Sequence, residues 1–116
     1  MTISPARHPL STPPLRLLLT SFPDAASAQS AATTLVTEHL AACVQILPSI
    51  VSTYAWQGSV ESASEVLVII KTSASTAPAA LDRLRALHPY EVPELVALEA
   101  SAAEPYLHWL TSHCSP

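Results

Sequence analysis

The spacing of hydrophobic and polar positions changes several times along the chain, and each change predicts a new element. Leu15 to Thr20 is an apolar run with the length of a buried strand. Pro23 and Asp24 then supply a turn and a helix N-cap, because the aspartate carboxylate can accept from free backbone N–H groups. The apolar residues that follow keep to one side of a helical period and predict an amphipathic helix: Ala28, Ala31, Ala32, Leu35 and Leu40.

From Cys43 onward the pattern alternates residue by residue, which is typical of a strand. The even positions carry the large apolar side chains Val44, Ile46, Ile50, Tyr54 and Trp56. We expect a bend or bulge at Pro48, since proline cannot donate to a strand ladder. Gly58 is the only glycine of the chain and marks a turn, after which Glu65 to Lys71 is rich in β-branched residues. The segment from Cys43 to Lys71 therefore predicts a long β-hairpin.

Three further elements complete the expected order. Ser75 or Thr76 caps a second helix that Pro89 ends, because a residue before proline is pushed out of helical geometry. The buried side of this helix is expected to carry Ala77, Leu81, Leu84 and Leu87 or His88. Glu94 to Glu99 predicts a fourth strand, and Pro105 to His113 predicts a short terminal helix.

The order strand, helix, strand, strand, helix, strand, helix predicts an α+β fold. Two βαβ units joined by a hairpin form a ferredoxin-like βαββαβ sandwich with an antiparallel sheet, here with an extra C-terminal helix. We expect this domain to span residues 15–114. Residues 1–14 are rich in Pro, Ser and Thr without periodicity and predict a flexible tail.

The third expected strand is apolar on both of its faces. Val66, Val68 and Ile70 point to one face, and Leu67 and Ile69 point to the other. Two crossover helices cover one face only, and exposing Leu67 and Ile69 to water would forfeit about 1.5 to 3 kcal/mol for each side chain. We therefore expect a neighbouring subunit on the second face, with the short terminal helix as the alternative cover.

Composition narrows the class of protein. A chain of 116 residues with 49% hydrophobic content has room for one domain with one core, while a charged fraction of 12% leaves little charged surface. A net charge of −4 with five Lys and Arg residues argues against nucleic-acid binding. The prolines ahead of Leu17 to Leu19 argue against a signal peptide. No apolar run is long enough to span a membrane. The chain has two cysteines and no CxxC motif, which favours a reduced, cytoplasmic location.

The motifs of common enzyme classes are missing. A GxSxG elbow, a P-loop and a GxGxxG loop each need several glycines, and this chain has one. His39, His108 and His113 have no histidine three or four residues away on the same helical face, so each is interpreted as a surface or interface histidine. We expect a protein that is not an enzyme.

A few residues keep a chemical interpretation beside a structural one. In His88-Pro89-Tyr90 the proline fixes the direction of an imidazole, which could act at a site or interact with the helix dipole. Cys43 could be a soft metal ligand or a buried structural cysteine in an apolar run. Glu91 and Glu94, on either side of Pro93, could be hard ligands or solvated loop charges.

Six ordered motifs then point to a known family. They are Leu40-Ala41-Ala42-Cys43, Tyr54-x-Trp56-x-Gly58, Glu65-Val66 leading to Lys71-Thr72, His88-Pro89-Tyr90, Pro93-Glu94-Leu95 and Tyr106-Leu107-x-Trp109-Leu110. In order and spacing they resemble the CutA divalent-cation-tolerance family, over about Leu15 to Leu110. The resemblance implies a subunit similar to the PII signalling proteins, a homotrimer in which long hairpins pair between subunits, and an association with copper or another divalent cation.

The resemblance also implies where the functional residues lie. Thiols of some family members would fall at Thr20 and Arg83 and a second histidine at Leu87, so this chain departs from the copper-associated pattern. Of the metal-associated positions only His88 remains, and Cys43, elsewhere on the fold, and Glu94 are the further candidate metal ligands. The expected trimer interface contains Tyr54, Trp56, Leu67 and Ile69.

Two alternatives stand beside a metal-binding trimer. A PII-like regulatory trimer would bind a small effector in an intersubunit cleft, with Lys71, His88 and Tyr90 holding an anion and Glu65 nearby. Glu65 and Lys71 also simply mark the two ends of a buried strand. The other alternative is a trimeric scaffold for a partner protein.

Overall fold

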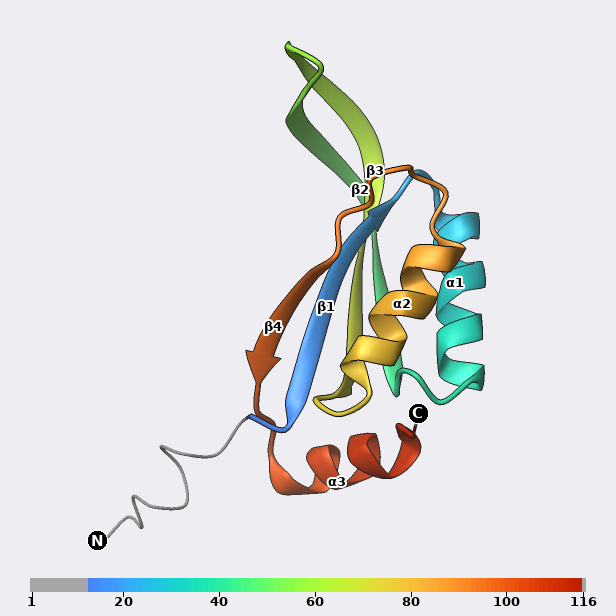
Figure 1. The fold of residues 1–116 in the computed structure, drawn as a ribbon, viewed down its shortest axis with the longest axis vertical. Helices are drawn as coiled ribbons and strands as arrows, with labels where there is room; N and C mark the ends of the chain where they lie inside the picture. The colour runs from blue at the N-terminus through green and yellow to red at the C-terminus, as the bar shows by residue number, and fades with distance from the viewer. Residues whose placement is uncertain (1–12, 116) are drawn as a thin grey trace, which may run out of the picture.

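The computed structural model describes residues 13–115 (Figure 1). Residues 1–12 of the tail expected over residues 1–14 therefore lie outside the described residues. The chain folds into seven elements: β1 (Leu15–Phe22), α1 (Ala25–Thr37), β2 (Cys43–Trp56), β3 (Ser59–Ser73), α2 (Ala77–Leu87), β4 (Val96–Ala100) and α3 (Glu104–His113). No helix among residues 13–115 is long and apolar enough to cross a membrane.

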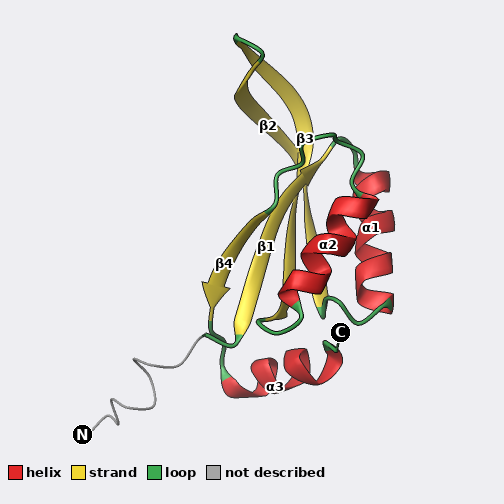
Figure 2. Cartoon of the chain, in the orientation of Figure 1, coloured by secondary structure: helices red, strands yellow, loops and turns green. Residues whose placement is uncertain are grey.

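The four strands form one antiparallel sheet in the order β2-β3-β1-β4. Helices α1 and α2 lie side by side on one face of this sheet, and α3 runs across the end of the sheet that is remote from the hairpin tip (Figure 2). The α+β, ferredoxin-like architecture with an extra C-terminal helix is therefore confirmed.

The core lies between the sheet and its two helices. Asp24 begins α1 as expected, since its carboxylate accepts from the Ser27 N–H at 2.7 Å. The buried face of α1 consists of Ala28, Ala31, Ala32 and Leu35, and small side chains let the helix lie close to the sheet. Leu40, predicted on the same helix, lies beyond its end but still packs against the core.

The hairpin turns where the sequence predicts. Trp56 pairs with Ser59, and the two residues between them, Gln57 and Gly58, have φ values of 48° and 83°. Positive φ at both central positions suits the right-handed twist of the strands. The ladder between β2 and β3 shifts register between Leu47 and Ile50, which confirms the irregularity expected at Pro48.

Several boundaries differ from expectation. β3 begins at Ser59 and not at Glu65, because polar residues of its outer half pair with β2, as the 3.1 Å bond between the Thr53 and Ser62 hydroxyls illustrates. Thr76 is the N-cap residue of α2, as one of the two expected candidates, but its side chain makes no capping hydrogen bond. The Ser73 hydroxyl instead accepts from the Thr76 N–H at 3.2 Å. β1 extends to Phe22 and β4 begins at Val96.

The second face of the sheet is apolar and has no helix over its centre among residues 13–115. Leu67 and Ile69 are partly exposed there. Strand register brings further apolar side chains to the same face: Leu17, Leu19, Leu47, Val96 and Leu98. Helix α3 packs its buried Leu110 with Leu15 at the end of the sheet, so the terminal helix leaves Leu67 and Ile69 partly exposed. This surface is called the open face below.

Candidate functional site

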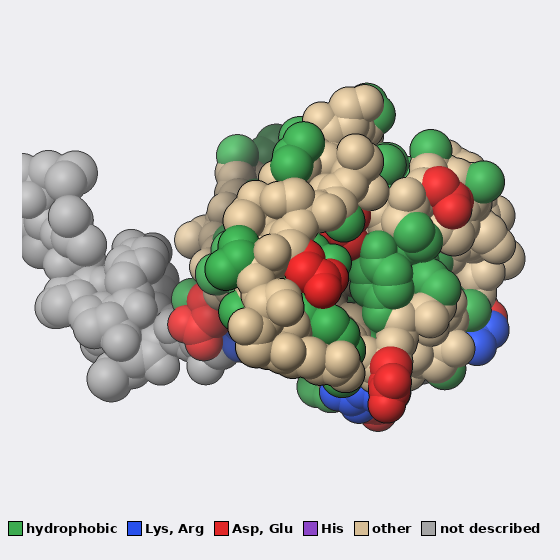
Figure 3. Space-filling view, turned by 90° about the horizontal axis from the view of Figure 1, so that it is seen from above, with side chains coloured by type: hydrophobic (Ala, Val, Ile, Leu, Met, Phe, Trp, Pro, Cys, Tyr) green, Lys and Arg blue, Asp and Glu red, His purple; other side chains and the backbone are tan. Residues whose placement is uncertain are grey.

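A cleft of about 940 Å³ lies at the base of the hairpin, between the strands β2 and β3 and the loop that joins α2 to β4. Its lining consists of Ser21, Ser52, Thr53, Tyr54, Trp56, Glu61, Glu65, Pro89, Tyr90, Glu91, Val92, Pro93 and Glu94. Figure 3 views this end of the molecule: acidic side chains lie among hydrophobic ones around a hollow, and Lys and Arg appear only at the margins of the visible, described surface.

Two predicted residues meet on one side of this cleft. The Tyr90 hydroxyl donates to a Glu65 carboxylate oxygen at 2.6 Å and so joins the loop after α2 to the hairpin base. Burial raises the pKa of Glu65, but hydrogen bonds from Ser52, Tyr90 and Ser21 outweigh burial and hold this pKa below its usual value. Burial and the adjacent Glu65 carboxylate raise the pKa of Tyr90, which stays protonated as a donor.

His88 lies behind these two side chains and is only 8% exposed. Its Nε2 lies 2.8 Å from the Ser21 carbonyl oxygen and 3.1 Å from the Thr20 hydroxyl, and its Nδ1 accepts from the Tyr90 N–H at 3.2 Å. Because a carbonyl only accepts, Nε2 carries the proton and the ring is held as one neutral tautomer. Burial lowers the pKa of His88 in spite of the Ser21 carbonyl and the Glu65 charge.

Both ring nitrogens of His88 are therefore used within this chain, which departs from the arrangement expected of a metal ligand. The imidazole also packs on Phe22, with ring centres 4.3 Å apart. In this geometry His88 fixes the start of the loop and the end of β1, and a metal ion would have to displace one of its hydrogen bonds.

Four of the residues that line the cleft are glutamates, namely Glu61, Glu65, Glu91 and Glu94, and in the part of the chain described no Lys or Arg lines it. Glu91 and Glu94 are exposed on the loop, and Glu61 is exposed on the outer half of β3. The cleft therefore has a negative potential that attracts cations and repels anions.

Two predicted site residues lie elsewhere. Lys71 is six positions along β3 from Glu65, a separation of roughly 20 Å at the rise of an extended strand. The Lys71 ammonium instead lies 5.6 Å from the centre of the Tyr106 ring on α3. Cys43 pairs with Lys71 across the sheet, so it too lies at the end remote from the cleft. The structure thus separates Cys43 and Lys71 from Glu65 and Tyr90.

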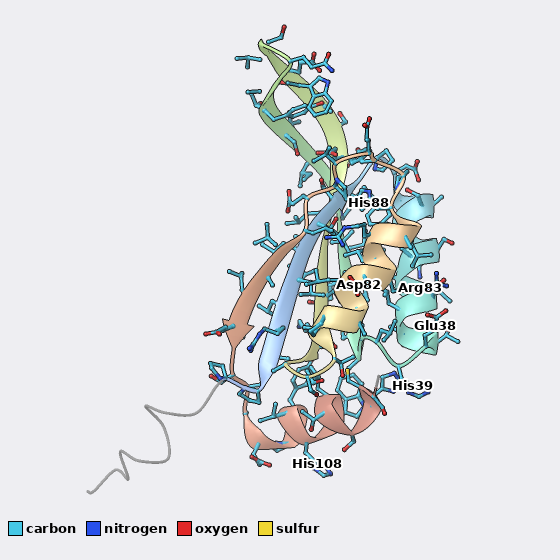
Figure 4. All side chains as sticks on the ribbon, viewed as in Figure 1. Glu38, His39, Asp82, Arg83, His88 and His108 are labelled. Carbon is cyan, nitrogen blue, oxygen red and sulfur yellow. The ribbon has the colours of Figure 1, made fainter. Side chains whose placement is uncertain are left out.

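The positions where some family members carry thiols or a second histidine have other roles here. The Thr20 hydroxyl contacts His88, and Leu87 packs against the core. Arg83 makes a bidentate pair with Glu38, both bonds being 2.9 Å long, and joins α2 to the end of α1 (Figure 4). Within residues 13–115 no three His, Cys, Asp or Glu side chains are arranged to hold a metal ion.

Tyr54 and Trp56, predicted at the trimer interface, are 42% and 43% exposed and form the hairpin wall of the cleft. Ser21 and Ser52 were missed by sequence reasoning, although both line the cleft and help to hold the pKa of Glu65 below its usual value. No local signal distinguishes these serines, because their role arises from strand pairing and not from a motif.

Comparison with known proteins identifies the family. The model of a family described as CutA1 divalent ion tolerance protein matches residues 16–113. Protein CutA of Mus musculus is 45% identical over 89 residues, which are 76% of this chain and 50% of the mouse protein. This chain thus spans about half the length of that mammalian relative.

Bacterial relatives match over most of their length. Divalent-cation tolerance protein CutA of Thermus thermophilus is 44% identical over 95 residues, 81% of this chain and 92% of that protein. The crystal structure of CutA1 from Shewanella sp. SIB1 aligns with a TM-score of 0.86 at 36% identity, covering 91% of this chain and all of the other. The chain therefore belongs to the CutA1 divalent ion tolerance family.

Proposed function

We propose that this protein is a non-enzymatic homotrimer that binds divalent cations in the cleft at the hairpin base. The observation that carries the proposal is the lining of that cleft, with four glutamates and, among residues 13–115, no basic side chain. Carboxylates are ligands for divalent cations, and an uncompensated group of them concentrates cations locally. The family name, a divalent ion tolerance protein, supports the same interpretation.

The open face supports the proposed assembly. It presents Leu67 and Ile69 together with the exposed Leu47, Val96 and Leu98. Burying such side chains contributes about 25 cal/mol for each Å² of apolar area, before the entropic cost of association is subtracted. Strand alternation places Glu65 on the same face as Leu67, so the cleft adjoins the surface on which a second copy would lie. A neighbouring subunit would therefore form a wall of the cleft.

The ligand set follows from this placement. The described residues of one subunit lack three suitably arranged ligands, so we propose that Glu61, Glu91 and Glu94 act together with groups of the adjacent subunit. Oxygen ligands suit Mn²⁺ and Mg²⁺, while Cu²⁺ binds most such sites more tightly than other divalent ions. We expect broad selectivity instead of a site specialised for copper.

Native mass measurement and calorimetry test the proposal together. We expect a trimer, and we expect Mn²⁺ to bind wild type and Glu104→Gln, a control on exposed α3, with equal affinity. The double variant Glu61→Gln with Glu91→Gln should lose at least ten-fold in affinity. Equal binding by the double variant and the wild type would overturn the cleft as the cation site, and a monomer would overturn the assembly.

The alternatives receive less support. An anionic effector would meet the four glutamates, while Lys71 lies at the far end of the open face. The imidazole of His88, the histidine nearest the cleft, has both nitrogens engaged, which supports a role other than catalysis. A scaffold role and the expected cytoplasmic location stay predictions, to be checked by affinity capture and by cell fractionation.

A further inference from the structure

Two histidines that are far apart in the sequence lie against each other at the opposite end of the molecule from the cleft. His39 lies in the loop after α1, and His113 is the last residue of α3. Their ring centres are 4.5 Å apart and their planes are inclined at 34°. Figure 4 places His39 beside the C-terminal end of α3, whereas His108 projects from the outer side of that helix.

A backbone carbonyl fixes the tautomer of each ring. The Nδ1–H of His39 donates to the His113 carbonyl oxygen at 3.0 Å, and the Nε2–H of His113 donates to the Val36 carbonyl oxygen at 3.1 Å. Because carbonyls only accept, Nε2 of His39 and Nδ1 of His113 keep their lone pairs. A hydrogen bond from the other ring nitrogen to a carbonyl is also what orients histidines that bind metals.

We propose that His39 and His113 form a two-imidazole site for a divalent transition-metal ion such as Zn²⁺, Ni²⁺ or Cu²⁺. Two imidazoles on one ion have ring centres roughly 4.5 to 5.3 Å apart, given metal–nitrogen bonds of about 2.0 to 2.1 Å. The observed 4.5 Å lies at the lower limit of this range. His39 is exposed, so an ion can enter from solvent and keep water as its other ligands.

The neighbouring thiol is not part of the site. Cys114 is buried, and its Sγ lies 3.6 Å from the Thr72 hydroxyl oxygen. The proposed site also does not depend on the cleft or on the trimer, because both ligands come from one subunit. Mn²⁺ prefers oxygen ligands, so binding of Mn²⁺ reports on the glutamate cleft and not on this nitrogen site.

A bound ion would fasten the end of α3 to the rest of the domain. The two segments are already joined by the hydrogen bond from the Ser115 N–H to the His39 carbonyl at 3.0 Å. A metal bridge adds a link that is present only when the ion is bound, so the ion should suppress local opening of α3.

Nitrogen-15 NMR of the imidazoles tests the site atom by atom at pH 7.5. Without metal, we expect the Nδ1–H tautomer for His39 and the Nε2–H tautomer for His113. Zn²⁺ should shift the resonances of His39 Nε2 and His113 Nδ1 and leave those of His108 unchanged. The opposite tautomers, or Zn²⁺ shifts confined to other histidines, would overturn the proposal.

Matched variants test the bridge by hydrogen exchange. His39→Asn keeps a donor near the Nδ1 position and tolerates the φ of 62° found there, while His113→Gln keeps a donor near Nε2. Both remove the free ring nitrogen. Zn²⁺ should slow amide exchange in α3 at least five-fold in the wild type and in the control His108→Gln, but not in either matched variant. Equal slowing in all four proteins, or none in the wild type, would contradict the bridge.

Discussion

The Tyr90 hydroxyl donates to the Glu65 carboxylate at 2.6 Å, and this bond joins the loop after α2 to the base of the hairpin. The short distance is typical of a hydrogen bond to a charged acceptor. The loop carries Glu91 and Glu94, so the same bond positions two of the four carboxylates that line the cleft. The cleft therefore depends on a contact between segments 25 residues apart in the sequence.

The hydrogen bond from Tyr90 to Glu65 should contribute measurably to stability. Tyr90→Phe removes the donor and leaves a buried carboxylate with one partner fewer, which should lower the free energy of unfolding by about 1.5 to 3 kcal/mol. Tyr106→Phe, on the exposed aromatic side chain of α3, is the control and should change stability little. Urea denaturation measures both, and equal losses for the two variants would argue against a special role for the Tyr90 hydroxyl.

Glu65 should make stability depend on pH in the acid range. Its pKa is lower in the folded state than the ordinary value of 4.5, so the unfolded chain binds the proton more readily. Its contribution is therefore present above about pH 4.5 and is lost as the pH falls through the folded pKa. The stability difference between wild type and Glu65→Gln should shrink between pH 6 and pH 3, whereas Glu104→Gln should show no such trend.

His88 should make stability depend on pH in a higher range than Glu65 does. Burial lowers its pKa from 6.5, so below that pH the unfolded chain takes up a proton that the folded chain resists. Stability should therefore rise with pH from the folded pKa up to about 6.5. His88→Gln should remove this part of the slope, while His108→Gln keeps it. Thermal unfolding from pH 5 to pH 8 makes the comparison, and an unaltered slope in His88→Gln would refute the argument.

The turn offers a stabilising change. Gln57 and Gly58 both have positive φ, and Asn tolerates this conformation better than Gln. Gln57→Asn creates the Asn-Gly pair preferred in such turns and should raise the melting temperature by one or two degrees. Gly58→Ala should destabilise by about 1 to 2 kcal/mol through backbone strain alone, since nothing lies within 4 Å of the added methyl group.

The open face can be tested by introducing a charge. Ile69→Asp places a carboxylate at the centre of the proposed interface and should convert the proposed trimer to monomers, while Ser30→Asp, exposed on α1, should not. Sedimentation velocity distinguishes the species. If the cleft needs a neighbouring subunit, the Ile69→Asp variant should also bind Mn²⁺ more weakly than the wild type. A trimer that survives Ile69→Asp would place the interface elsewhere.

Local patterns determined much of the fold. The Asp24 cap, the irregularity at Pro48 and the turn at Gly58 were predictable because each depends on the chemistry of a few consecutive residues. The doubly apolar strand was predictable for the same reason, since alternation assigns Leu67 and Ile69 to one face without knowledge of the neighbours. The outer half of β3 was predicted only as part of the hairpin and not from its own pattern, because its polar residues have no apolar alternation.

Tertiary structure determined which side chains meet at each candidate site. Lys71 and Glu65 belong to one strand, yet an extended chain places them roughly 20 Å apart, whereas Tyr90 reaches Glu65 from another element. The hydrogen bonds that occupy both nitrogens of His88 come partly from the carbonyl of Ser21, which no side-chain motif reveals. His39 and His113 likewise become neighbours only when α3 docks, because contacts between distant segments leave no local periodicity in the sequence.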